Sequence, residues 1–135
     1  MEAAADRGRR SAVRVLIADD EPQFVELVEA LLAGEEEIEV VASAQDGQEA
    51  VELARAHDPD VIVMDIWMPV IDGIEATRQI HRDNPNARIL ILTGSSTSAD
   101  VDRSRTAGVA GFLTKDRIEA HLVETILGLE TRELP

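Results

Sequence analysis

The stretch that decides the fold is residues 61–73, which read VIVMDIWMPVIDG. Its first four residues are an unbroken apolar run, the pattern of a strand that is buried on both faces. Asp65 follows this run directly, and Pro69 with the Asp72-Gly73 pair then predicts a turn. A charged residue at the carboxyl end of a buried parallel strand lies where open α/β sheets keep their ligand sites. On this stretch alone, an Asp that only caps the next loop is an equal alternative.

The composition narrows the class of protein. The chain has 135 residues, which favours one domain with its own core, and it has no Cys for a disulfide or a thiolate metal site. No run of about 18 apolar residues predicts a membrane span. Residues 1–12 lack the apolar region of a secretory signal, so we expect a cytoplasmic protein with a flexible N-terminal arm. The net charge of −14 argues against a nucleic-acid surface.

Five apolar stretches that predict strands alternate with five stretches that predict helices. The strands are expected at residues 13–18, 38–43, 61–64, 88–92 and 110–113, and the helices at 22–33, 48–57, 74–82, 98–107 and 118–127, the last ended by Gly128. Strands joined by single helices run parallel, with helices on both faces. The prediction is an α/β protein with a flavodoxin-like doubly wound (βα)5 fold and a five-stranded parallel sheet in the order 2-1-3-4-5. The domain is expected to cover residues 13–130, followed by a tail at 131–135.

Two of the predicted helices differ in their apolar faces. The first has a continuous stripe that is expected to face the core, formed by Phe24, Leu27, Val28, Leu31 and Leu32. The helix at 98–107 offers only Ala99, Val101 and Ala107. A helix with so thin an apolar face is expected to be held loosely enough to shift.

Polar residues follow four of the predicted strands. Asp19 and Asp20 follow the first strand, Asp65 the third, Thr93 the fourth and Lys115 the fifth. Because the carboxyl ends of parallel strands meet at one edge of the sheet, these side chains are expected to converge on one crevice.

The three carboxylates in this set favour a metal. Two like charges about 4 Å apart repel by about 1 kcal/mol in water and about 4 kcal/mol near a protein surface. A divalent cation relieves the repulsion, and hard oxygen ligands without His or Cys indicate Mg²⁺ or Mn²⁺. A carboxylate beside a metal and a lysine is also placed to act as a nucleophile on phosphorus.

On these motifs the chain resembles the receiver domains of two-component response regulators, over about residues 13–129. The matching motifs are Asp19-Asp20 with Glu21, Asp65-Ile66-Trp67-Met68-Pro69 with Asp72-Gly73, Thr93-Gly94, and Phe112-Leu113-Thr114-Lys115. The stretches GIEATRQI (73–80) and AGVAGFLTKD (107–116) resemble NarL/FixJ-type receivers most. The resemblance implies that a sensor histidine kinase or a phosphotransfer protein donates a phosphoryl group to Asp65.

The resemblance also implies a metal site at this aspartate. Asp20, the Asp65 carboxylate and the Trp67 carbonyl would bind Mg²⁺, and Asp19 would act through a metal-bound water. Lys115 would pair with Asp65 and then with the phosphoryl group.

A switch is implied as well. Thr93 would donate its hydroxyl to a phosphoryl oxygen, the backbone N–H groups of Trp67 and Gly94 would complete the phosphate site, and Phe112 would turn inward as Thr93 moves. The changed surface would signal to a downstream protein partner or output domain, as a monomer or as a phosphorylation-dependent dimer. No enzymatic activity is expected beyond weak self-dephosphorylation.

The chain departs from the family pattern in three places. Trp67 is large where many receivers have a small or polar residue, and Phe112 replaces the more usual Tyr. Asp116 and not Pro follows Lys115, which leaves the isomer of that peptide bond open. None of these changes removes a reactive group. The three histidines fall on separate predicted helices and are expected to be surface residues: His57, His81 and His121.

Four functions remain to be compared. The favoured one is a stand-alone receiver, and the first alternative is the receiver half of a helix-turn-helix transcription factor whose DNA-binding domain is absent from this chain. The second is a Mg²⁺-dependent aspartyl phosphohydrolase, which typically carries a second Asp two residues after the first. Trp67 occupies that position and cannot donate a proton to a leaving group. The third is a receiver-like binding module that never meets phosphate, against which the complete set of reactive residues argues.

Overall fold

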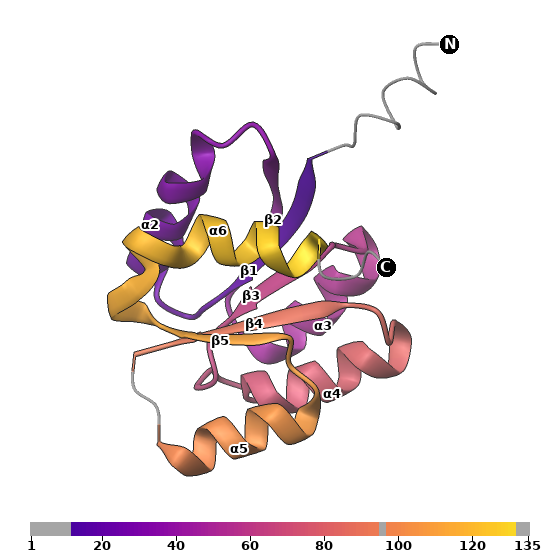
Figure 1. Ribbon diagram of the computed structural model, residues 1–135. Helices are drawn as coiled ribbons and strands as arrows, with labels where there is room; N and C mark the ends of the chain where they lie inside the picture. Colours follow the sequence, from indigo (N-terminus) through magenta and orange to yellow (C-terminus); the bar gives the residue numbers. More distant parts are fainter. Residues whose placement is uncertain (1–11, 95–96, 132–135) are drawn as a thin grey trace.

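The structure, a computed structural model, describes residues 12–94 and 97–131. Five parallel strands form one sheet in the order β2-β1-β3-β4-β5 (Figure 1). The strands are β1 (Val13–Ala18), β2 (Ile38–Ala44), β3 (Val61–Met64), β4 (Arg88–Thr93) and β5 (Gly111–Thr114). The helices are α2 (Pro22–Ala33), α3 (Gly47–His57), α4 (Gly73–Asp83), α5 (Ser98–Ala107) and α6 (Ile118–Thr131), with a 3-10 turn η1 (Lys115–Arg117) before α6. The predicted fold class and strand order are confirmed. The predicted N-terminal arm, apart from Ala12, lies outside the described residues.

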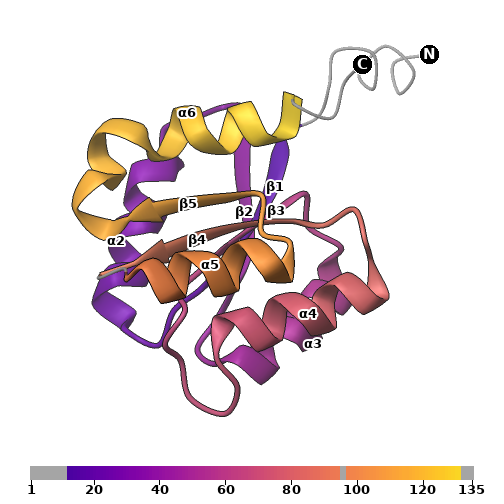
Figure 2. The same ribbon diagram turned by 60° about the horizontal axis from the view of Figure 1, so that its bottom comes forward.

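Helices cover both faces of the sheet. Helices α2 and α6 lie on one face, and α3, α4 and α5 lie side by side on the other (Figures 1 and 2). Strand β3 sends Ile62 and Met64 to the face under α3 and α4, and Val61 and Val63 to the face under α2 and α6. All four side chains are buried. The unbroken apolar run of β3 is therefore explained by a strand that is covered on both sides.

Two predictions about helices were wrong. Leu27 was expected in the core and is 40% exposed. Helix α2 lies beside α6, and the part of its apolar stripe that carries Leu27 faces solvent (Figure 1). Helix α6 was expected to end at Gly128 but continues to Thr131, so the predicted tail begins inside it. Burial of Leu129 in the core offsets the helix penalty of a glycine, which is about 0.5–1 kcal/mol.

Helix α5 also differs from its predicted packing. Of the three residues expected to form its inner face, Ala99 is exposed, and the residues that are buried are Asp100 and Ser104. Ala107 does pack against the core, at the C-terminal end of the helix. The first two turns of α5 therefore present polar groups to the rest of the protein.

The loop between β3 and α4 folds tightly back on the phosphoacceptor candidate Asp65. The backbone N–H of Gly73 donates to the Ile66 carbonyl at 2.6 Å, and a Cβ at Gly73 would collide with the backbone carbonyl of Asp65. We expect Gly73→Ala to lower the free energy of unfolding by about 1–3 kcal/mol, the usual cost of inserting a methyl group where there is no room.

Urea unfolding measures this effect, and Gly128→Ala is its matched control. A Cβ at Gly128 meets nothing within 4 Å, so this helical substitution is expected to stabilise the protein by about 0.5–1 kcal/mol. Equal stability of Gly73→Ala and the wild type would contradict the tight closure of the loop.

Candidate functional site

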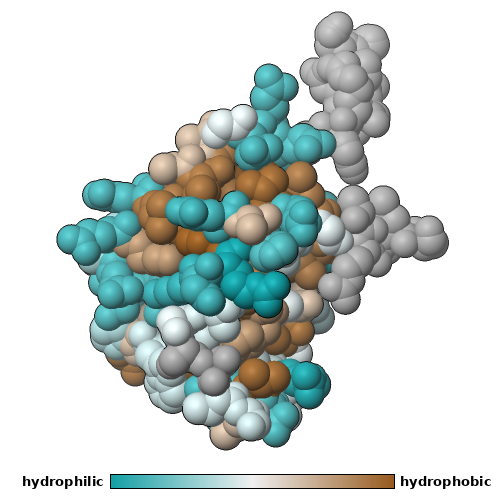
Figure 3. All heavy atoms as spheres, turned by 60° about the vertical axis from the view of Figure 1, so that its left-hand side comes forward, coloured by the Kyte–Doolittle hydropathy of each residue, from teal (hydrophilic) through white to brown (hydrophobic). Residues whose placement is uncertain are grey.

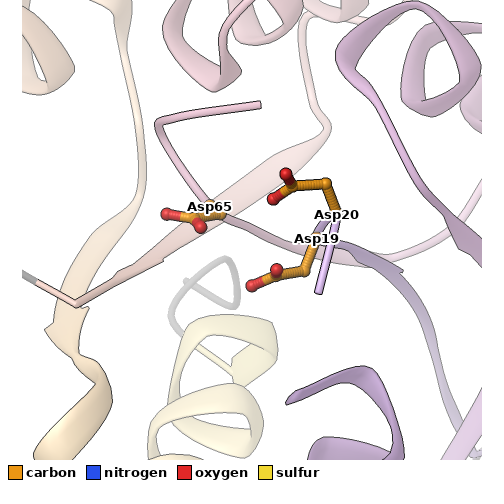
Figure 4. Close-up of side chains that lie close together, drawn as sticks. All are labelled: Asp19, Asp20 and Asp65. Atoms are coloured by element: carbon orange, nitrogen blue, oxygen red, sulfur yellow. The ribbon is translucent and has the colours of Figure 1, made fainter. Parts of the chain in front are cut away.

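Three carboxylates meet at the carboxyl edge of the sheet. Asp19 and Asp20 follow β1, and Asp65 follows β3, which is the neighbour of β1. One oxygen of each carboxylate lies within 4.8 Å of the others (Figure 4). Asp19 and Asp65 are buried, with 2% and 8% of their surface exposed, whereas Asp20 is exposed. The site thus has two buried carboxylates and one that is open to solvent.

Lys115 lies among these carboxylates. Its Nζ donates to Asp65 Oδ2 at 3.3 Å and to Glu21 Oε1 at 3.2 Å. Nζ also lies 2.8 Å from Asp19 Oδ2, as an ion pair outside hydrogen-bond geometry. The ring of Phe24 supports the ammonium from another side, with its centroid 4.0 Å from Nζ, a cation–π contact. Lys115 therefore joins the end of β5 to the ends of β1 and β3.

The pKa values of Asp65 and Lys115 are both raised, for different reasons. Burial raises the pKa of Asp65, and the charge of Asp19 adds to the rise, while Lys115 and the Ile66 N–H oppose it. Burial acts to lower the pKa of Lys115, but Asp19, Asp65 and Glu21 outweigh it, so the pKa of Lys115 is raised. The lysine consequently stays protonated at neutral pH.

The donor set suits a hard divalent cation. The three carboxylates supply oxygen atoms only, which is the preference of Mg²⁺ and Mn²⁺. Within the part of the chain that the structure describes, no histidine joins this group: His81 contacts the Ala87 carbonyl, and His121 contacts Glu124.

The other predicted residues lie on the same edge. Thr93 ends β4, next to β3, and is buried, and Gly94 follows it in an exposed position. On β5, Phe112 pairs with Ile91 and packs, half-buried, against the core on the α3–α4 face. The peptide bond between Lys115 and Asp116 is trans.

Figure 3 looks onto the side of the molecule where the strands end, and hydrophilic residues form a band across it between apolar areas.

Sequence reasoning missed three residues of the site. Glu21 and Phe24 contact Lys115, although the motif comparison gave Glu21 no role. Glu21 is the N-cap of α2 directly after Asp20, and Phe24 lies in the first turn of that helix, which was a signal that could have identified them. Arg103 contacts both Trp67 and Asp72. The sequence around Arg103 gives no signal of these contacts, because they depend on how helix α5 is rotated about its axis.

Residues 15–127 match the family model of the response regulator receiver domain. The chain belongs to the response regulator receiver family. The receiver is 39% identical over 114 residues to the transcriptional regulatory protein DegU of Brevibacillus brevis, a match that covers 84% of this chain and 48% of that protein. It is 38% identical over 104 residues to the chemotaxis protein CheY of Halobacterium salinarum, covering 77% of this chain and 85% of that protein.

A solved structure agrees with this family. The signal receiver domain of the putative response regulator NarL from Mycobacterium tuberculosis superposes with a TM-score of 0.86 at 34% identity, covering 90% of this chain and 98% of that chain. The resemblance stated from the sequence motifs is therefore confirmed. The receiver spans about half the length of the transcriptional regulators that it matches. No helix among its described residues is long and apolar enough to cross a membrane.

Proposed function

We propose that this receiver accepts a phosphoryl group on Asp65 from a sensor histidine kinase or a phosphotransfer protein, with Mg²⁺ or Mn²⁺ held by Asp19, Asp20 and Asp65. The observation that carries the proposal is the convergence of the three carboxylates with Lys115. The cation, when bound, offsets the charge of the phosphoryl oxygens. The Trp67 carbonyl is proposed as a further ligand.

The Asp65 carboxylate is held ready for attack. One oxygen accepts the Ile66 N–H at 2.8 Å and the other contacts Lys115. In the transfer, an Asp65 oxygen bonds to phosphorus while the bond from phosphorus to the imidazole nitrogen of the donor breaks. Lys115 then donates to a phosphoryl oxygen, while Asp19 and Glu21 keep its ammonium in place. The positive charge of Lys115 stabilises the negative charge that gathers on the phosphoryl group.

The residues at the end of β4 are expected to respond to phosphorylation. Thr93 and the backbone N–H groups of Trp67 and Gly94 are proposed to donate to phosphoryl oxygens, and Phe112 turns inward as Thr93 moves. Hydrogen bonds to charged groups are worth about 1.5–3 kcal/mol each, so two of them, one from Thr93 and one from a backbone N–H, supply about 3–6 kcal/mol. A shift from 1:99 to 99:1 needs about 5.5 kcal/mol. The altered surface then binds a downstream partner or output domain, as a monomer or as a phosphorylation-dependent dimer.

A small-molecule phosphodonor tests this function without a known kinase. The wild type, incubated with acetyl phosphate and Mg²⁺, is expected to gain one phosphoryl group by intact mass spectrometry. Chelation of the cation with EDTA is expected to prevent the gain. An unchanged mass under both conditions would overturn the proposal.

The receiver half of a transcription factor is the second candidate, because several relatives are transcriptional regulators twice as long as the matched segment. This chain is not itself expected to bind DNA, given its net charge of −14. A gel shift with duplex DNA at physiological salt checks this, and tight binding would contradict it.

An aspartyl phosphohydrolase is disfavoured because Trp67 occupies the position at which such an enzyme has its general acid. We also propose a cytoplasmic location, which the resemblance to response regulators supports.

Trp67 is expected to lengthen the life of the phosphorylated state. The water that hydrolyses the acyl phosphate approaches opposite the Asp65 oxygen, near the side chain two residues further on. An indole there excludes water and has no acceptor to orient it. Trp67→Asn is expected to speed dephosphorylation several-fold with little change in Mg²⁺ affinity, as measured by the decay of the phosphorylated mass. Ser95, two residues after Thr93, is small and is expected to admit water from the other side, and it lies outside the described residues. Unchanged or slower decay would refute the covering role of the indole.

A further inference from the structure

Arg103 joins helix α5 to the loop that follows Asp65. Its guanidinium carbon lies 5.7 Å from the centroid of the Trp67 ring, within the range of a cation–π contact. One nitrogen donates to Asp72 Oδ2 at 3.1 Å, and another lies 3.8 Å from Asp100 Oδ1 on its own helix. The guanidinium is thus held by two carboxylates while it lies over the indole, although Trp67 itself is 53% exposed.

The carboxylate that holds Arg103 is itself fixed. Asp72 is the N-cap of α4, and its Oδ1 accepts the Glu75 N–H at 2.8 Å. The next residue, Gly73, closes the loop onto the Ile66 carbonyl. Arg103 therefore binds the loop at a residue that is itself hydrogen-bonded to α4, and its guanidinium contacts the Trp67 ring from there.

The packing of α5 gives the contacts of Arg103 a large share in holding the first turns of this helix. The polar side chains of Asp100 and Ser104 are buried on the inner side of the helix, with 8% and 1% of their surface exposed. Ser104 Oγ has no hydrogen-bond partner among the described residues. The apolar contact of the helix lies at its C-terminal end, at Ala107. The first turns of α5 therefore depend on polar contacts such as those of Arg103, and a displacement of α5 would change the contact with Trp67.

We infer that Arg103 is a positioning residue, which holds the indole of Trp67 beside the phosphoacceptor and thereby lengthens the life of the phosphorylated state. This inference rests on the proposed phosphorylation of Asp65. With Arg103 in place, the indole stays in the path of the hydrolytic water. Without it, the half-exposed indole is free to turn toward solvent. Because α5 carries the arginine, a movement of α5 releases the indole and shortens the signal.

The position of the indole can be measured without phosphorylation. Trp67 is the only tryptophan of the chain, so its fluorescence reports this site alone. Arg103→Gln is expected to increase the quenching of this fluorescence by acrylamide, and Arg103→Lys is expected to have a smaller effect because it keeps a cation. Arg105→Gln is the matched control: this arginine is on the same helix, is exposed, and pairs with Asp102 of that helix. Quenching equal to wild type in Arg103→Gln would overturn the inference.

The decay of the phosphorylated form tests whether Arg103 lengthens the life of the phosphorylated state. Arg103→Gln is expected to speed dephosphorylation about two- to fivefold, the factor expected from the loss of one exposed cation–π contact, and Arg105→Gln is expected to leave it unchanged. In a Trp67→Asn background, Arg103→Gln is expected to add nothing, because its effect acts through the indole. An equal acceleration in that background, or a slower decay of the single variant, would overturn the inference. If the wild type takes up no phosphoryl group, the proposed function fails, while the quenching comparison still decides whether Arg103 positions Trp67.

Discussion

Replacement of Asp65 by Asn is expected to abolish phosphoryl uptake completely. The amide has the size of the carboxylate, and its one oxygen can still accept the Ile66 N–H, so the arrangement of the loop is retained. Its NH2 group replaces the oxygen that accepts from Lys115, and this lysine keeps Asp19 and Glu21 as partners. The amide oxygen carries no negative charge, however, and is not a nucleophile toward phosphorus. Burial of the charged carboxylate is unfavourable and raises the pKa of Asp65. Because the amide is uncharged, the replacement removes this cost, and no loss of stability is expected to accompany the loss of function.

The measurement is the intact mass after treatment with acetyl phosphate and Mg²⁺. Asp116→Asn is the matched control, because it makes the same chemical change at an exposed residue directly after Lys115. This control is expected to gain one phosphoryl group, as the wild type does. Labelling of Asp65→Asn to the wild-type extent would show that another residue is the acceptor.

Weaker binding of the proposed metal is the second large effect that we expect, and Asp20→Asn is expected to cause it. Asp20 is the exposed carboxylate of the cluster, so its replacement removes a ligand without disturbing the core. The loss of one anionic ligand out of three is expected to weaken Mg²⁺ binding about tenfold or more, a change of about 1.4 kcal/mol or more in binding free energy. Phosphoryl uptake is expected to fall with it.

The fluorescence of Trp67, which lies in the loop beside the cluster, follows a Mg²⁺ titration. The wild type is expected to show a saturable change, which Asp20→Asn shifts to much higher concentration. Glu124→Gln removes the same charge from an exposed position on α6 and is expected to bind as the wild type does. An Asp20→Asn titration that coincides with that of the wild type would place the metal elsewhere.

The fold and the convergence of the carboxylates could be predicted because they follow from periodicity and topology. The four apolar residues of β3 require cover on both faces, and strands that alternate with helices must run parallel. Once the strands are parallel, Asp19 and Asp65 must share an edge, whatever the details of packing. Most element boundaries agree to within one residue for the same reason, since glycine and proline mark them locally.

The contact between Lys115 and Asp65 was expected, but the other contacts of the site could not be predicted, because they depend on rotations and on distances of a few tenths of an ångström. Lys115 lies closer to Asp19 than to Asp65, at 2.8 Å against 3.3 Å, which no motif specifies. The rotation of α5 buries Asp100 where the periodicity suggested alanine and valine. Val70 adopts a φ of 76°, a conformation that β-branched residues rarely take, because the loop closes from Asp65 to Gly73.

The most direct test of the central claim is to locate the phosphoryl group. The protein phosphorylated by acetyl phosphate is treated with borohydride, which reduces an acyl phosphate to an alcohol, and is then digested and mapped by mass spectrometry. The account predicts that the reduced residue is Asp65 alone. Reduction at Asp19, Asp20 or Asp72, or a phosphoryl group that borohydride does not remove, would contradict it.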